Sequence, residues 1–392
     1  MNVKNRTPLT LLMAPLLLVL LWSAPPFGQG FGQGFAGLGG DSDGFAEVTQ
    51  GKTFSFPQDH GAHPEFRIEW WYVTANLSDA AGNPYGIQWT LFRRALTPGS
   101  QQGGWNQQQL WLGHAALSAR GRHLSAEIAA RGGTGQAGVT TEPFAAWIDD
   151  WSLSSIARQS PAAGAPGPDA FSDMRLTASD EAFSYDLSLA TDKNLIFHGE
   201  NGFSRKSDIG QSEGGQSEGG QSEGSQASYY YSQPFFAVSG TVSLDGKDIE
   251  VTGKAWLDRE WSSQPLAASQ TGWDWFSLHF DSGAKLMLFR LRDKAAAAYT
   301  SGTWISPDGS ATALAPDDII MTPLQTARIA GRDVPIRWRL EVPGKGVAVK
   351  TEALNADSWM DTSIPYWEGP VQVSGSHEGV GYLEMTGYVA GE

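Results

Sequence analysis

The chain has 392 residues, no cysteine, 16 tryptophans and a formal net charge of −15 at pH 7. The absence of cysteine excludes disulfide scaffolds, thiolate metal sites, cysteine nucleophiles and the lipid-anchored cysteine of a bacterial lipoprotein. The acidic balance argues against nucleic acid or anionic lipid as a partner, so we expect partners that are neutral or apolar. With 47 glycines and only 18 % charged residues, the composition favours aromatic strands joined by glycine turns.

The first 24 residues have the pattern of a secretory signal. Lys4 and Arg6 precede an apolar run over 9–22, and small residues follow at Ser23 and Ala24. A membrane-spanning helix needs roughly 20 apolar residues, so a retained anchor is the weaker alternative. We expect a periplasmic or secreted protein with no stable membrane span after signal cleavage.

Two low-complexity segments interrupt the chain. Residues 25–47 contain Gly-Gln-Gly-Phe repeats and predict a flexible linker. Residues 210–226 repeat Gly-Gln-Ser-Glu-Gly, and each copy fits the G-x-S-x-G nucleophile elbow of α/β-hydrolases, with the serines at Ser212, Ser217 and Ser222. A polar tandem repeat cannot build the strained strand-to-helix turn that the elbow needs, so we predict a solvated loop.

Elsewhere the sequence alternates with the period of β-strands. Residues 69–77 place Trp71, Val73, Ala75 and Leu77 on one face, and a turn-rich stretch then leads into a second strand, which predicts a hairpin. No amphipathic helix longer than about two turns is evident. Many short strands with glycine turns predict an all-β sandwich or barrel. The expected strands are 69–77, 85–96, 110–117, 183–190, 236–242, 249–256, 275–280, 285–292, 337–342, 372–375 and 381–388.

A sequence motif that occurs twice predicts a duplicated barrel. The stretch 69–72 opens a hairpin that closes with Leu-Phe-Arg at 91–93, and 274–276 opens one that closes with Leu-Phe-Arg at 288–290. A chain longer than roughly 250 to 300 residues is also expected to divide into two domains. The predicted organisation is a signal peptide over 1–24, a linker over 25–47, a first domain over 48–264 with a loop at 210–226, and a second domain over 265–392.

Each half places a carboxylate where an apolar side chain is expected. Glu69 shares its face with Trp71, and Asp274 shares its face with Phe276. A buried carboxylate must pair with a cation or take up a proton. One interpretation is therefore a structural ion pair with Arg93 or Arg290, and the other is a neutral acid that can protonate a substrate.

The densest polar cluster is Trp-Leu-Asp-Arg-Glu-Trp at 256–261. Alternation directs Asp258 and Glu260 to one side and Arg259 and Trp261 to the other. Repulsion between the two carboxylates would raise one pKa; the alternative is an inter-domain salt-bridge network with Arg259. The further cluster at 366–368, which ends in Glu368, predicts the start of a strand with an aromatic plug.

The histidines are weaker candidates. His60 and His63, followed by Glu65, have no helix to align them, and we predict no metal site there. His114 precedes an apolar stretch and fits a hydrogen-bonded core histidine better than a catalytic one.

Three stretches together resemble one family. Residues 63–72, 253–261 and 272–276 are similar to the AttH-like secreted branch of the carotenoid 1,2-hydratase superfamily. The resemblance implies two consecutive lipocalin-like β-barrel domains, export, and association with ABC transport systems. Superfamily hydratases of acyclic carotenoids use an aspartate as proton donor, with histidine, tryptophan and tyrosine nearby, and no cofactor.

The catalytic residues of those hydratases carry over only in part. Where their His-x-Trp motif is expected, this chain has Arg259-Glu260-Trp261, so the tryptophan matches and the histidine does not. Their Tyr-x-Asp motif is missing near 286–291. A hydratase built on this sequence would need another proton donor, and the candidates are Asp258, Glu260 and Asp274, with Arg259 beside them.

Two functions follow. The first is binding of a hydrophobic lipid or isoprenoid in an aromatic β-barrel pocket, with transfer to an ABC transporter as an extension. The alternative is hydration of a C=C bond in an acyclic carotenoid or related isoprenoid, because aromatic faces stabilise a carbocation and an apolar pocket keeps an acid protonated. The candidate ligand-binding residues are Trp70, Trp71, Tyr72, Trp261, Trp273 and Trp275, and the further polar candidates are Glu69, His114 and Glu368.

Overall fold

The computed structural model describes residues 42–99, 103–156, 169–207, 226–264, 266–267 and 269–390. The predicted signal peptide, residues 25–41 of the predicted linker and the three repeat serines lie outside the described residues. Within the described residues, no helix is long and apolar enough to cross a membrane.

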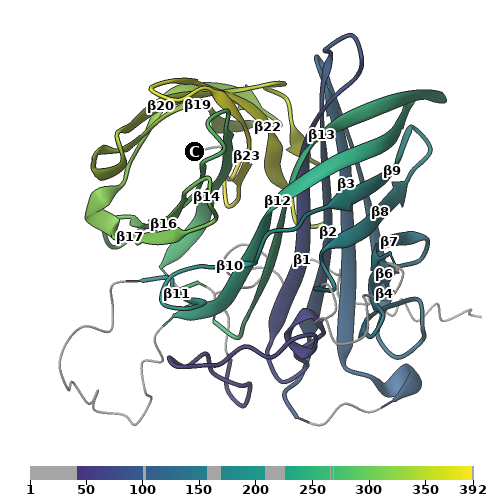
Figure 1. The fold of residues 1–392 in the computed structure, drawn as a ribbon. Coiled ribbons are helices and arrows are strands. Elements are labelled where there is room, and N and C mark those ends of the chain that lie inside the picture. The colour runs from purple at the N-terminus through teal and green to yellow at the C-terminus, as the bar shows by residue number, and fades with distance from the viewer. Residues whose placement is uncertain are drawn as a thin grey trace, which may run out of the picture.

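The chain forms two antiparallel sheets, which Figure 1 shows as two curled bodies side by side. The first sheet runs in the order β4-β3-β2-β1-β13-β12-β9-β8-β7-β6-β5, and β10 and β11 pair with β12. Its strands are β1 (Ile68–Ser78), β2 (Pro84–Ala95), β3 (Gln109–Ala119), β4 (Arg122–Arg131), β5 (Ala137–Thr141), β6 (Phe144–Ile148), β7 (Trp151–Ser155), β8 (Asp173–Ser179), β9 (Phe183–Ala190), β10 (Ile196–Phe197), β11 (Phe203–Arg205), β12 (Ala227–Leu244) and β13 (Lys247–Ser262).

The second sheet runs in the order β17-β16-β15-β14-β23-β22-β20-β19-β18, and β21 pairs with β22. Its strands are β14 (Gln270–Phe280), β15 (Lys285–Asp293), β16 (Tyr299–Ile305), β17 (Ala311–Leu314), β18 (Ile320–Ile329), β19 (Arg332–Val342), β20 (Val347–Ala353), β21 (Trp359–Met360), β22 (Tyr366–Gly375) and β23 (Gly379–Met385). The two sheets match around β1 and β14, because each of these strands pairs with the hairpin strand that follows it and with the last strand of its sheet. The prediction of an all-β chain with two lipocalin-like barrels is confirmed.

The motif that is repeated in the sequence also has the same strand register in both hairpins. Glu69 lies directly opposite Arg93 in the β1–β2 ladder, and Asp274 lies directly opposite Arg290 in the β14–β15 ladder. In both hairpins the following aromatic residue faces the phenylalanine of the Leu-Phe-Arg motif. A shared alternation therefore sends the acids inward and the flanking aromatic residues outward.

Each sheet encloses its own apolar core. The first core contains the alternating set of β1 that begins with Trp71 and Val73, and the second contains Phe276, Leu278 and Phe280 of β14. A third apolar cluster, with Trp256, Trp275 and Tyr382, lies between the sheets on their outer faces. Apolar contacts therefore form three layers, one inside each barrel and one between the two barrels.

Several strands were not predicted from the sequence, among them β4 and β18. Their burial is weak: seven of the ten residues of β18 are exposed, and β4 is mostly half-buried. Strands at the rim of a barrel lack the strict apolar alternation on which the prediction depends. The helical segments within the described residues are short 3-10 turns, namely η3 (Gln58–His60), η4 (Gly104–Asn106), η5 (Pro316–Asp318) and η6 (Pro343–Lys345).

Candidate functional site

A cavity of about 110 Å³ lies between the outer faces of the two barrels. Residues of both sheets line it, and most of the lining is aromatic or aliphatic. This position differs from the prediction of a pocket inside one barrel, because the interior of the first barrel is filled by its apolar core. We call this space the inter-barrel cleft.

The first wall of the cleft is the outer face of β2, β1, β13 and β12, where the register aligns side chains in rows. One row contains Thr90, Tyr72, Asp258 and Ser232 in neighbouring strands. The next row contains Phe92, Trp70, Glu260 and Tyr230. A third row contains Arg94, Ile68 and Ser262. Successive rows are two residues apart along each strand, so the row of Arg94 lies four residues along the strands from the row of Asp258.

The second wall belongs to the other barrel. Its alignment places Phe289, Trp275 and Glu384 in one row across β15, β14 and β23, and Leu291 beside Trp273 in the next. The Trp275 indole donates a hydrogen bond to the Tyr230 hydroxyl at 3.1 Å, which joins the two walls directly. Side chains of the two barrels are therefore in direct contact at the cleft.

Asp258 is the central polar group of the first wall. Its carboxylate accepts hydrogen bonds from Tyr230 Oη at 2.6 Å, from Trp256 Nε1 at 2.6 Å and from the Ser232 hydroxyl. Only 3 % of the residue is exposed. Burial outweighs these donors and raises the pKa of Asp258 from 3.8 to about 7, with repulsion from Glu260 as the smallest cause. The predicted repulsion is present, but desolvation dominates the shift.

A hydrogen-bonded chain extends behind Asp258 to the second barrel. Since the Ser232 hydroxyl donates to Asp258, its oxygen accepts from Nε2 of His198, 2.6 Å away. Nδ1 of His198 then accepts from the Thr303 hydroxyl at 2.8 Å. Burial, followed by the charge of Lys206, lowers the pKa of His198 to about 3, so its imidazole is neutral. The chain fixes the orientation of the Ser232 hydroxyl beside Asp258.

Glu260 has a different environment although it lies two residues away. Lys206 Nζ is 2.7 Å from its carboxylate, and the Ser228 hydroxyl donates to the same oxygen. The ammonium of Lys206 also lies 4.4 Å from the centre of the Phe289 ring. Glu260 is therefore an ion-paired carboxylate, whereas Asp258 accepts hydrogen bonds from two hydroxyl groups and an indole, and its pKa lies near 7.

Two further carboxyl groups, Glu384 and Glu368, come from the second barrel, and Glu384 lines the cleft. Glu384 was not predicted as a site residue. Glu384 and Glu368 are direct cross-strand partners on β23 and β22. Trp273 Nε1 donates to Glu384 at 2.7 Å, and burial raises the pKa of Glu384 to about 8. Burial, then repulsion from Glu384, raises the pKa of Glu368 well above its usual value. Glu384 could have been found from the alternation of 381–385, in which it faces away from Leu383 and Met385.

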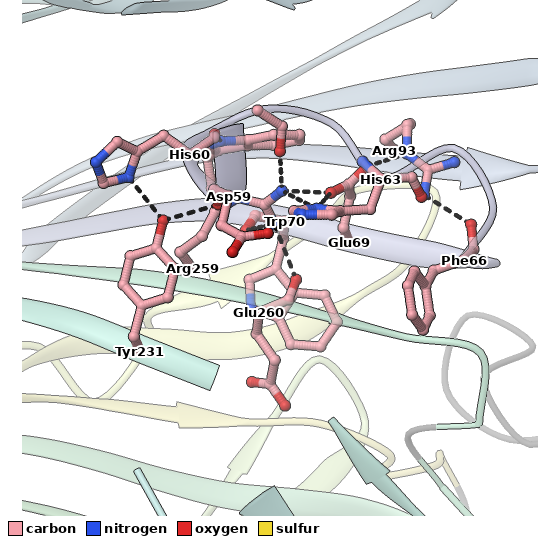
Figure 2. Close-up of polar contacts among 12 residues, drawn as sticks. Asp59, His60, His63, Phe66, Glu69, Trp70, Arg93, Tyr231, Arg259 and Glu260 are labelled. Atoms are coloured by element: carbon pink, nitrogen blue, oxygen red, sulfur yellow. Dashed lines mark hydrogen bonds and ion pairs between the residues drawn. The ribbon is translucent and has the colours of Figure 1, made fainter. Parts of the chain in front are cut away.

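Glu69 belongs to the interior of the first barrel rather than to the cleft. Arg93 and Arg259 both donate to its carboxylate, and the backbone N–H of His63 adds a bond of 2.8 Å. Burial alone would raise the pKa of Glu69, but the two guanidinium charges hold it well below its usual value. Figure 2 shows this cluster, with the Glu260 side chain directed away from Arg259. Of the two interpretations for Glu69, the structure supports the ion pair.

The same cluster holds the segment that precedes β1. The imidazole of His63 stacks on Trp261 at 3.9 Å and reaches Asp59 at 3.1 Å, while Arg259 lies over the Trp71 ring at 3.9 Å. Arg259 therefore makes its contacts inside the first barrel. This corrects the alternative of an inter-domain salt-bridge network with Arg259.

Asp274 is the counterpart of Glu69 in the second barrel. Arg290 Nη2 donates to it at 2.7 Å, Arg292 forms a second ion pair, and the Tyr388 hydroxyl donates at 2.9 Å. The residue is fully buried on the face of β14 opposite to Trp275. Asp274 therefore lies apart from the cleft, and its structural ion pair accounts for its burial.

The structure thus divides the predicted site residues into three groups. Those that line the cleft are Trp70, Tyr72, Asp258, Glu260, Trp273 and Trp275. Those inside the barrels are Glu69, Trp71, Arg259, Trp261 and Asp274, and this placement corrects the expectation that Trp71 and Trp261 share a pocket with the other tryptophans. His114 and Glu368 lie between the barrels, where His114 Nδ1 is 3.0 Å from Tyr366 Oη and the Tyr72 hydroxyl donates to Glu368.

The comparisons with known proteins agree with this architecture. The AttH-like family model matches residues 47–388. An AttH protein from Nitrosomonas europaea is 34 % identical, with a TM-score of 0.72, over 88 % of this chain and 100 % of the other. Kievitone hydratase from Nectria haematococca has 14 % identity and a TM-score of 0.62 over 88 % of this chain and 97 % of its own.

A structure of CghA with Sch210972 has 12 % identity and a TM-score of 0.51 over 90 % of this chain and 98 % of its own. These two likenesses below 25 % identity concern the fold. A comparison with curated protein sequences gave no match. The family model and the Nitrosomonas europaea structure both span most of the chain, and together with the two-barrel architecture they show that the chain belongs to the AttH-like family.

Proposed function

We propose that this AttH-like chain binds an apolar unsaturated small molecule in the inter-barrel cleft and adds water to one of its C=C bonds, with Asp258 as the proton donor. The observation that carries the proposal is the pKa of Asp258, which burial raises to about 7 in a cleft lined by indole rings. A carboxylic acid that stays protonated near neutral pH is the group that acid-catalysed hydration of an alkene requires.

The reaction balances with water as the other reactant. The proton of Asp258 adds to one alkene carbon, the π electrons form the new C–H bond, and a carbocation develops on the other carbon. Water attacks that carbon, and the proton that it loses returns to the Asp258 carboxylate. Alkene and water are consumed, an alcohol is released and the enzyme is regenerated.

The walls of the cleft suit the intermediate. The indole rings of Trp70, Trp273 and Trp275 line the same space as Asp258. Aromatic faces stabilise a desolvated cation by about 2 kcal/mol or more. General acid assistance contributes roughly 10² to 10⁴ in rate. The shared fold with kievitone hydratase supports the proposal at the level of architecture.

The second candidate function is that of a carrier, which binds the ligand and does not transform it. The apolar lining that spans both barrels favours a carrier as much as a hydratase. One experiment separates the two functions. The purified protein is incubated with oleic acid or with lycopene, and recovered ligand is analysed by mass spectrometry. A product heavier by one water, lost in Asp258→Asn and retained in Asp186→Asn on the outer surface, supports the hydratase.

Tight binding of unchanged ligand by the wild type would contradict hydration of that ligand and support the carrier. A product that persists in Asp258→Asn would contradict Asp258 as the acid. Export and delivery to an ABC transporter remain proposals, which cell fractionation and co-purification with a permease would test.

A further inference from the structure

Three basic side chains from both barrels lie close together, and none of them lines the inter-barrel cleft. Lys254 is on β13, four residues before Asp258 and on the same face of the strand. His279 and Lys285 are direct cross-strand partners on β14 and β15 of the second barrel. The rings of Trp256 and His279 make an edge contact at 5.7 Å, so the two barrels meet here. We call Lys254, His279 and Lys285 the basic cluster.

The basic cluster has no counter-charge within the part of the chain that the structure describes. Neither lysine forms an ion pair there, and the only charged group that shifts the pKa of Lys285 is Lys254. Lys285 Nζ donates to the Gly283 carbonyl at 3.3 Å and lies 4.5 Å from the centre of the Phe235 ring, and both partners are uncharged. Burial, then repulsion from Lys254, lowers the pKa of Lys285 to about 8. Positive charge is thus gathered at one place in a chain whose net charge is −15.

His279 provides a second, independent observation. Only 3 % of the residue is exposed, and its Nδ1 has no hydrogen-bond partner among the described residues. Buried polar atoms without a partner are rare, because they lose their contacts with water and gain none in return. Burial, then the charges of Lys285 and Lys254, lowers the pKa of His279 to about 3, so the imidazole is neutral. A neutral imidazole has one N–H group that can donate to an anion.

We propose that the basic cluster binds a phosphate group, which Lys254 and Lys285 hold from the two barrels while His279 donates its ring N–H. An ammonium group is a point charge with three donors and binds phosphate well, whereas a carboxylate is matched better by the paired donors of arginine. A ligand with two negative charges also offsets the repulsion between the two lysines. The site shares no residue with the cleft, so it is independent of the proposed hydration.

The experiment titrates the full chain with inorganic phosphate, glycerol 3-phosphate and acetate, at pH 7 and constant ionic strength, by isothermal titration calorimetry. We expect phosphate to bind at least about tenfold more tightly than acetate. Lys254→Gln and Lys285→Gln should each weaken the binding of phosphate by about tenfold, and Lys285→Arg should restore part of it. Lys350→Gln, which changes an exposed lysine on β20, is the matched control and should bind phosphate as the wild type does. Tighter binding of glycerol 3-phosphate would identify a phosphate monoester as the ligand, and weaker binding would identify free phosphate.

Thermal unfolding provides a second readout. Phosphate should raise the midpoint of unfolding of the wild type but not that of the Lys254→Gln/Lys285→Gln double variant, because a ligand that binds the folded state stabilises it. Circular dichroism without phosphate shows that the variants fold. Equal binding of phosphate and acetate, binding that survives in both glutamine variants, or no binding of phosphate overturns the inference. A hydrated product without phosphate binding overturns this inference alone, and phosphate binding without a hydrated product overturns the hydratase alone.

Discussion

The Tyr72 hydroxyl on β1 donates a hydrogen bond to the Glu368 carboxyl group on β22, so the two barrels are joined by a buried polar contact beside the cleft. Both residues are nearly inaccessible to solvent. Burial, followed by repulsion from Glu384, raises the pKa of Glu368 well above its usual value, so this contact joins a phenol to a neutral carboxylic acid. The second barrel thus supplies part of the wall around Asp258 without adding a buried charge.

Removing the Tyr72 hydroxyl should weaken this contact between the barrels. Tyr72→Phe leaves a buried oxygen of Glu368 without its donor, and we expect a loss of ~1–3 kcal/mol in the free energy of unfolding, measured in urea. Glu368→Gln should be nearly neutral at pH 7, because an amide oxygen still accepts from Tyr72. Tyr85→Phe, whose hydroxyl makes a long bond of 3.4 Å to Asp79 near the surface, is the matched control. A destabilised Glu368→Gln would contradict the neutral state of Glu368.

Asp258 should make stability depend on pH in a defined direction. Its pKa rises from 3.8 in the unfolded chain to about 7 in the folded protein, so the folded state holds the proton over that interval. The stabilisation is complete below the lower value and is lost as pH rises through the upper one, at ~1.4 kcal/mol per pH unit.

Asp258→Asn isolates this contribution, because the amide does not titrate. The difference in unfolding free energy between wild type and Asp258→Asn, measured in urea from pH 4 to pH 8, should fall as pH rises and level off near neutrality. A difference that stays constant across this interval would show that Asp258 is ionised throughout and would remove the basis for its role as an acid.

The buried carboxylate of Glu69 in the first barrel is expected to stabilise the fold in its ionised form, unlike Asp258. Glu69 is held ionised by Arg93 and Arg259, so Glu69→Gln leaves two buried guanidinium groups with too little negative charge. We expect a loss of about 3–5 kcal/mol at pH 7. Asp186→Asn breaks the exposed pair with Arg175 and should cost less than about 1 kcal/mol. Unfolding in urea measures both, and equal effects would show that the Glu69 cluster contributes no more than a surface pair.

The sequence was sufficient to predict the repeated hairpin and the faces of its residues. Strict alternation in β1 and β14 separates Glu69 and Asp274 from their aromatic neighbours, and the register confirms both pairings with arginine. Alternation also placed Asp258 and Glu260 on the face opposite Arg259. These are local properties of a strand, in which successive side chains point to opposite sides of a sheet.

The location of the cleft could not be predicted in the same way. Alternation shows that two residues share a face, but not whether that face turns to a barrel interior or to a second barrel. The sequence therefore predicts both Trp70 and Trp71 as ligand-binding residues, although Trp70 lines the cleft and Trp71 is packed inside the first barrel. Glu384 was not predicted as a site residue, because its environment depends on Trp273 and Glu368, which come from other strands of the same sheet.

The separation of these two neighbouring tryptophans gives the last prediction. Trp70 is half-buried on the wall of the cleft, so Trp70→Ala should weaken binding of oleic acid by about tenfold while the protein remains folded. Trp71 is fully buried, donates to the His60 carbonyl at 2.9 Å and packs against Arg259. Trp71→Ala should therefore cost about 3–5 kcal/mol in stability.

Trp105, which is 77 % exposed, provides the control, and Trp105→Ala should change neither property. Fluorescence titration and urea unfolding of the three variants measure affinity and stability side by side. If Trp70→Ala bound oleic acid as the wild type does, the aromatic wall between the barrels would not be the surface that the hydrocarbon chain contacts. A stable Trp71→Ala with weakened binding would instead place the ligand inside the first barrel, where its core now fills the space.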